Sequence, residues 1–117
     1  MSERVPVLRI GETLLVSLQR DLHDAAAQAF QEDVLMELER TGVRGLIVDI
    51  SGLDTVDSYV AHVLANTAKM SRLMGARTLV VGMRPMVAAT LVRMGAMLDG
   101  VETALNVTEG LARLQQR

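Results

Sequence analysis

The sequence predicts a single α/β domain over residues 1–117, with a mixed, mostly parallel sheet, an N-terminal hairpin at the sheet edge and about four helices packed on it. Three observations favour this fold class. After an initial pair of β-rich runs, helical and β-rich runs alternate along the chain, which is typical of parallel strands joined by helical crossovers. Gly, Pro and Asp separate the runs. The 117 residues, 50% of them hydrophobic, are sufficient for one buried core.

The first two runs, at residues 5–10 and 13–18, form the predicted hairpin. Gly11 and Glu12 separate them, and glycine at the first position of a two-residue loop favours a type II′ turn. Pro6 cannot donate a hydrogen bond to a ladder, so we expect the first strand to lie at an edge of the sheet.

A helix and a buried strand follow the hairpin. Asp21 or Asp24 is suited to the N-cap of the helix, and Gly42 is suited to its end. Apolar residues at helical spacing define its core face, namely Ala27, Phe30, Val34 and Leu38. Residues 45–50 are short, largely apolar and rich in β-branched side chains, which is typical of a strand buried on both faces.

A second amphipathic helix is predicted from Ser58 to about Met74, ending at Gly75. Its core face would hold Val60, Val63, Thr67, Met70 and Met74. Its opposite face would hold Ser58, His62, Asn66, Lys69 and Arg72. This pattern places Ser58 on the solvent side, where another protein can reach it.

The C-terminal third continues the alternation. A strand at residues 77–81 precedes a third helix at residues 85–94, whose opening proline suits a first helical position. A weak last strand is predicted within residues 100–105. Asn106 and Glu109 have the spacing of a capping box for a short terminal helix.

The composition narrows the classes of function. Cysteine is absent, so the chain has no disulfide framework or thiolate nucleophile. No apolar run approaches the roughly 20 residues that cross a bilayer, and no signal peptide opens the chain, so we expect a cytoplasmic location without membrane association. The net charge of −2 argues against nucleic acid as a partner. The glycine-rich phosphate-binding motifs are missing, and we expect no cofactor.

The acidic loop between residues 46 and 58 has several chemical interpretations. Asp49, Asp54 and Asp57 carry oxygen ligands suited to Mg²⁺, although roles in the loop and the helix cap explain the last two equally well. Asp49 also has the position of a receiver-domain phospho-acceptor, but the acidic pair and the late lysine of that chemistry are absent. The histidines, His23 and His62, lack metal-ligand spacing and are expected at the surface.

Ser58 is the strongest candidate site. A hydroxyl at the start of a helix can accept phosphate, because the first turn has free N–H groups and the positive end of the helix dipole. The simpler interpretation is that Ser58 is an N-cap, with Asp57 as a rival for that role.

Residues 48–100 resemble the STAS domain of anti-sigma-factor antagonists. The resemblance rests on Asp49-Ile50-Ser51 after the strand, on Val56-Asp57-Ser58 at the helix start, and on runs at residues 73–77, 82–85 and 91–95. Similarity to the RsbS branch of the family, the single-domain type found in the stressosome, is carried by residues 14–19, 30–33 and 70–76, and it extends over nearly the whole chain. Many antagonists have D-S-[ST]-G where this chain has Asp57-Ser58-Tyr59-Val60, which disfavours the direct sigma-factor pathway.

The resemblance implies a non-enzymatic scaffold that controls the general stress response by partner switching. It would assemble with RsbR-type STAS paralogues and with copies of itself, and hold a serine kinase of the RsbT type inactive until Ser58 is phosphorylated. A phosphatase would reset Ser58, and Thr90 would be a secondary phosphosite. The residues around the phosphosite and in contact with the kinase would be Asp49, Asp54, Thr55, Asp57, Tyr59 and His62. The alternatives are a module that binds a nucleotide or a lipid, as some STAS domains do, and a direct anti-sigma-factor antagonist.

Overall fold

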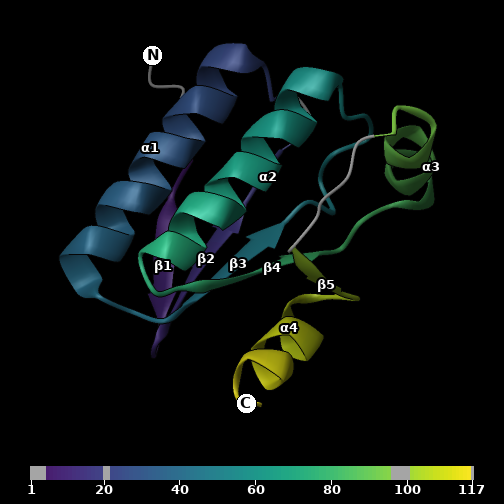
Figure 1. The fold of residues 1–117 in the computed structure, drawn as a ribbon. Helices are drawn as coiled ribbons and strands as arrows, with labels where there is room; N and C mark the ends of the chain where they lie inside the picture. Colours follow the sequence, from purple (N-terminus) through teal and green to yellow (C-terminus); the bar gives the residue numbers. More distant parts are fainter. Residues whose placement is uncertain (1–4, 20–21, 96–100, 117) are drawn as a thin grey trace.

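The computed structural model describes residues 5–19, 22–95 and 101–116. In this part of the chain, five strands form one mixed sheet in the order β1-β2-β3-β4-β5, and four helices pack against it (Figure 1). The strands are β1 (Val7–Ile10), β2 (Thr13–Ser17), β3 (Gly45–Asp49), β4 (Arg77–Val81) and β5 (Glu102–Ala104). The helices are α1 (Asp24–Thr41), α2 (Ser58–Leu73), α3 (Pro85–Arg93) and α4 (Val107–Leu114). The predicted fold class is confirmed.

The hairpin forms the edge of the sheet, as predicted. β1 pairs with β2 in an antiparallel register, whereas β2, β3, β4 and β5 are parallel to their neighbours. Gly11 has a φ of 59°, and Glu12 does not have a positive φ. This combination is the one that a type II′ turn requires.

Two layers of helices bury the central strands. α1 and α2 lie side by side on one face of the sheet (Figure 1), and the larger core cluster forms between them and the strands. All four residues of the predicted α1 core face are buried. α4 lies on the opposite face, where Leu111 and Leu114 pack against the cluster formed by Ile47, Leu79 and Val81. Leu46 and Val48 belong to the first cluster, so β3 is buried on both faces, as its apolar sequence predicts.

The start of α1 differs from the prediction. His23 occupies the N-cap position without a side-chain cap hydrogen bond, and Asp24 is the first helical residue. The predicted cap at Asp24 is therefore wrong, and Asp21 lies outside the described residues. The Asp24 carboxylate still interacts favourably with the helix dipole in the first turn. At the other end, Gly42 has a φ of 66° and ends the helix, as predicted.

The core face of α2 also differs in part. Val60, Val63 and Thr67 are buried as expected, but Met70 and Met74 are exposed. The inward positions near the end of the helix are occupied by small side chains, Ala68 and Ser71. Small residues allow the helix to approach the sheet closely, and the two methionines then lie outside the contact.

Arg77 links three elements at the start of β4. Its Nη2 donates a hydrogen bond to Oε1 of Glu102 in β5 at 2.7 Å. Its Nη1 donates to the carbonyl oxygens of Arg113 and Gln116 at 3.2 and 2.9 Å. The side-chain hydrogen bonds from Arg77 hold the pKa of Glu102 below its ordinary value, and the positive charges of Arg113 and Arg72 act in the same direction.

Replacing Glu102 by glutamine is expected to lower the free energy of unfolding by about 0.5–1 kcal/mol at pH 7, because the ion pair is partly exposed. The folded-state pKa of Glu102 lies below the ordinary value of 4.5. The stabilisation is therefore present above about pH 4.5 and is lost as the pH falls through the folded-state pKa. Urea unfolding of wild type and Glu102→Gln should give a difference at pH 7 that shrinks on acidification. Glu39→Gln, at an exposed position of α1, is the matched control, and an equal cost there would contradict the assignment.

Candidate functional site

The loop between β3 and α2 is a defined structure. Its buried side chains, Ile50, Leu53 and Val56, anchor it to the core. The backbone N–H of Ile50 donates to the carbonyl of Val81 at 2.9 Å, and the N–H of Leu53 donates to the carbonyl of Ile50 at 3.0 Å. The loop therefore presents the start of α2 in a fixed position at the carboxyl end of the parallel strands.

Asp49 shapes this loop. It is half-buried at the end of β3, and its Oδ1 accepts a hydrogen bond from the backbone N–H of Ser51 at 2.9 Å. Gly82 lies directly against it: a Cβ at Gly82 would be 2.8 Å from Asp49 Oδ1 and 2.9 Å from Ser51 Cβ. This contact joins segments more than 30 residues apart along the chain, and no local pattern in the sequence indicates it.

The N-cap of α2 is Asp57 and not Ser58. Asp57 Oδ1 accepts a hydrogen bond from the backbone N–H of Val60 at 2.8 Å. Ser58 is the first helical residue and is exposed. Because the cap is provided by the neighbouring carboxylate, the Ser58 hydroxyl is not needed to stabilise the helix end. An oxyanion on Ser58 would lie at the positive end of the α2 dipole.

Two contacts connect the surroundings of Ser58 to other helices. Asp54, in the loop, forms an ion pair with Arg84, the N-cap residue of α3. The Tyr59 hydroxyl donates a hydrogen bond to Oε1 of Gln28 in α1 at 3.1 Å. Neither Arg84 nor Gln28 was identified from the sequence, since each belongs to an element distant along the chain from the site.

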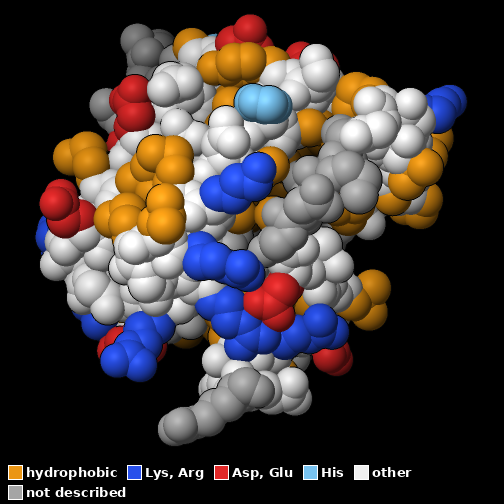
Figure 2. Space-filling model, viewed as in Figure 1, with side chains coloured by type: hydrophobic (Ala, Val, Ile, Leu, Met, Phe, Trp, Pro, Cys, Tyr) orange, Lys and Arg blue, Asp and Glu red, His pale blue; other side chains and the backbone are white. Residues whose placement is uncertain are grey.

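The exposed stripe of α2 has the predicted composition. Ser58, His62, Lys69 and Arg72 are exposed, and Asn66 is half-buried. Figure 2 shows Lys and Arg side chains grouped between the C-terminal end of α2 and α4, with an acidic side chain among them. The surface of α2 therefore changes from an acidic loop at its start to a basic cluster at its end.

Thr90 lies on α3 and differs from Ser58 in its environment. It is half-buried, and its hydroxyl donates a hydrogen bond to the carbonyl of Met86, one turn earlier, at 2.8 Å. A kinase would have to break this bond to reach the Thr90 oxygen. The Ser58 side chain is exposed, and so are the predicted kinase contacts Thr55, Asp57, Tyr59 and His62.

The described residues contain no group of three or more His, Cys, Asp or Glu side chains placed to hold a metal ion. In particular, Asp49 and Asp57 are each used in a backbone hydrogen bond, and Asp54 is paired with Arg84. Among the same residues, no helix combines the length and the apolar character needed to cross a membrane.

The mixed five-stranded sheet with an antiparallel first pair and four helices is the architecture of a STAS domain. The model of the STAS domain family matches residues 4–110. The chain therefore belongs to the STAS domain family.

Two solved structures and a curated relative refine this assignment. An RsbS of Moorella thermoacetica with the substitution S58E is 34% identical, with a TM-score of 0.84 over 95% of this chain and 94% of that one. A chain from the structure of the molecular architecture of the stressosome, a signal integration and transduction hub, is 36% identical, with a TM-score of 0.82 over 94% and 96% of the two chains. The RsbT co-antagonist protein RsbRB of Bacillus subtilis (strain 168) is 29% identical over 91% of this chain and 39% of its own length.

The chain spans about two fifths of the length of the curated relatives that it matches first. It is thus close to the RsbS and RsbR proteins of the stressosome, and similar to nearly the full length of the RsbS chain.

Proposed function

We propose that this chain is a non-enzymatic scaffold, formed by one STAS domain over residues 1–117, that holds a serine kinase of the RsbT type inactive and releases it when Ser58 is phosphorylated. It assembles with RsbR-type paralogues and with further copies of itself in a cytoplasmic stressosome. A phosphatase resets Ser58, and the cycle of partner switching controls the general stress response.

The observation that carries the proposal is the position of Ser58. Its side chain is exposed as the first residue of α2, beside a carboxylate that already caps the helix. The similar Moorella RsbS has glutamate in place of a serine that carries the same number in its own chain, and glutamate imitates part of the charge of a phosphoserine. In the proposed complex, Asp54, Thr55, Asp57, Tyr59 and His62 contact the kinase, while Asp49 acts through the shape of the loop.

Electrostatic energies favour release of the bound kinase over a conformational change in the domain. A phosphate adds about −1.5 to −2 charges at pH 7. One pair of like charges about 6 Å apart repels by roughly 3 kcal/mol at an effective dielectric of about 20. The α2 dipole stabilises the same phosphate by about 0.3–2 kcal/mol. Phosphorylation should therefore leave α2 folded and weaken binding of the docked kinase by about 100-fold.

Replacing Ser58 by alanine is expected to abolish phosphorylation and to leave the kinase bound. The purified chain, incubated with its cognate kinase and ATP, should gain the mass of one phosphate, and peptide mapping should place it on Ser58. Ser58→Ala should gain none, and it should retain the kinase in a pull-down after ATP is added, because the repulsive charge never forms.

Thr90→Ala is the control, since it removes the secondary candidate hydroxyl and should leave phosphate incorporation unchanged. Full incorporation into Ser58→Ala would overturn the proposal, and Thr90 would be the first residue to test next. Native mass spectrometry of the same sample would also reveal a bound nucleotide or lipid, as the alternative function requires.

A further inference from the structure

The outer edge of the sheet is an apolar strand without a partner among the described residues. β1 is the terminal strand and pairs only with β2. Leu8 and Ile10 are 57% and 44% exposed. Their side chains point to the face of the sheet on which α4 lies, but α4 contacts β3, β4 and β5 and leaves β1 uncovered. An exposed edge strand with unpaired backbone groups can accept another strand, although β1 is short, with four residues that include Arg9.

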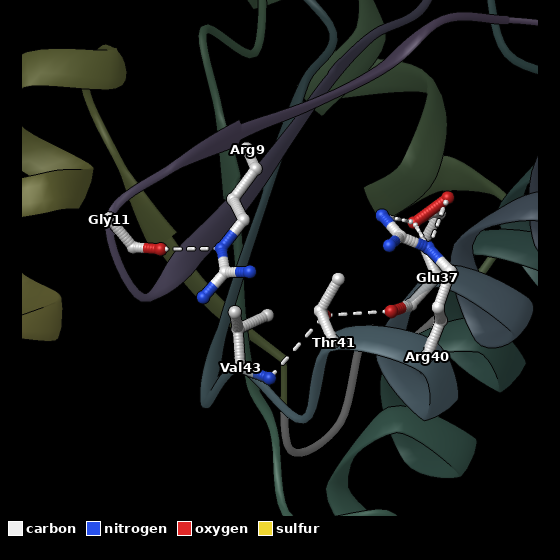
Figure 3. Close-up of polar contacts among 6 residues, drawn as sticks. All are labelled: Arg9, Gly11, Glu37, Arg40, Thr41 and Val43. Atoms are coloured by element: carbon white, nitrogen blue, oxygen red, sulfur yellow. Dashed lines mark hydrogen bonds and ion pairs between the residues drawn. The ribbon is translucent and has the colours of Figure 1, made fainter.

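The other face of the same edge is a shallow groove of about 410 Å³ between β1 and α1, lined by Val5, Pro6, Val7, Asp33, Met36 and Glu37. Met36 is 67% exposed. Arg9 also lies on this face, two residues along from Val7. Figure 3 shows it bent back to the carbonyl of Gly11, near the C-terminal end of α1. Arg9 also pairs with Glu12 of its own hairpin at 3.6 Å, and Glu37 of the groove pairs with Arg40 at 2.7 Å, so charges of both signs lie along this edge.

The turn determines which backbone groups of β1 point outward. In a type II′ turn, Ile10 and Thr13 close the loop as a hydrogen-bonded pair, and hydrogen-bonded pairs alternate with non-hydrogen-bonded pairs along an antiparallel ladder. The pair Leu8–Leu15 is then hydrogen-bonded as well, and the N–H and C=O groups of Val7 and Arg9 point away from β2. By the same alternation, the backbone nitrogen of Pro6 points toward β2. The N–H that proline lacks is therefore not one that the outer edge would use.

We propose that this edge binds β1 of a second copy of the chain in an antiparallel arrangement about a twofold axis at Leu8. In this register, Val7 of one copy forms hydrogen-bonded pairs with Arg9 of the other, so all of the outward groups identified above are satisfied. Leu8 faces its symmetry mate in a non-hydrogen-bonded pair, and the exposed leucine and isoleucine side chains of both copies form one apolar strip.

Electrostatic repulsion favours the register with the axis at Leu8 over the register with the axis at Arg9. A twofold axis at Arg9 would place two guanidinium groups opposite each other, which is unfavourable. With the axis at Leu8, Arg9 of each copy lies beside Val7 of the other, and the two guanidinium groups do not face each other. The two sheets then join into one continuous sheet. This pairing specifies a surface for the self-association that the proposed function includes, and its test requires neither the kinase nor Ser58.

A single cysteine tests the register, because the chain has none of its own. In the proposed dimer of Leu8→Cys, the Cα atoms of the two cysteines would be about 4.5 Å apart, a distance that a disulfide can bridge. In the matched variant Ile10→Cys, on the same face, the two residues would be about 14 Å apart. Under mild oxidation, Leu8→Cys should form a covalent dimer at a rate that exceeds that of Ile10→Cys by about tenfold or more. Equal rates, or faster cross-linking of Ile10→Cys, would overturn the proposal.

A charge at the axis provides a second, independent measurement. Leu8→Lys should raise the dissociation constant of the dimer by about tenfold or more, since two ammonium groups would face each other. Leu73→Lys, at an exposed leucine in the last turn of α2, is the matched control and should behave as wild type. Sedimentation over a concentration series reports both constants, and circular dichroism confirms folding. A monomeric wild type, or equal effects of the two lysines, would exclude this edge as the interface.

Discussion

Ser58→Asp is expected to weaken binding of the RsbT-type kinase by about tenfold or more relative to wild type, part of the effect of a phosphate, with the free energy of unfolding nearly unchanged. The physical reason is that the added carboxylate lies at the positive end of α2, which tolerates it, while it faces the docked partner, which does not. Titration calorimetry or biolayer interferometry of the purified chain with the kinase measures this change directly. Because electrostatic repulsion between exposed groups is screened, the loss should be smaller in high salt.

Thr108→Asp is the matched control for this charge. Thr108 is exposed in the first turn of α4, which Asn106 caps through a hydrogen bond from the N–H of Glu109 at 2.9 Å. The substitution therefore adds the same charge at a capped helix start on the opposite face of the sheet, and it should leave kinase affinity unchanged. If both variants weaken binding equally, net charge and not the position of Ser58 controls release.

Gly82→Ala is expected to lower the free energy of unfolding by about 3 kcal/mol. Gly82 has a φ of 75°, where a side chain costs about 1–2 kcal/mol, and the added Cβ would overlap the Asp49 carboxylate and the Ser51 side chain. The loop that leads to Ser58 would have to move, so both stability and kinase binding should fall. Urea unfolding monitored by circular dichroism measures the first effect.

Gly42→Ala separates backbone strain from overlap. Gly42 has a similar φ of 66°, but nothing lies within 4 Å of the position of its Cβ. The expected cost is therefore about 1–2 kcal/mol, from strain alone. If the two substitutions cost the same, the contact between Gly82 and the Asp49 turn does not constrain the loop.

The order and type of the elements were predictable because they depend on local patterns. The alternation of β-rich and helical runs, Gly11 in its turn and Pro85 at the start of α3 each report a local backbone preference. The inner face of α2 was predicted only in part, because Met70 and Met74 have helical spacing with the core residues. Whether such residues are buried depends on where the sheet ends beneath the helix. The small residues Ala68 and Ser71, which do face inward, carry almost no hydropathy signal.

The candidate site shows the same division between local and long-range information. The exposure of Ser58 followed from the periodicity of α2, which is a local property. The choice of Asp57 as the cap was left open, since both residues are good caps and only the geometry of the chain entering the helix distinguishes them. The contacts of Asp49 with the Gly82 region, of Asp54 with Arg84 and of Tyr59 with Gln28 join segments 30 or more residues apart, and no local pattern encodes them.

The hydrogen bond from Val60 to Asp57 has a consequence for the neighbouring side chain of Ser58. The Asp57 carboxylate caps α2, so the Ser58 hydroxyl is not needed to stabilise the first turn of the helix. Substitution of Ser58 should therefore leave the fold intact. If Ser58 is phosphorylated as proposed, phosphate can be added and removed through many cycles while the first turn of α2 stays closed.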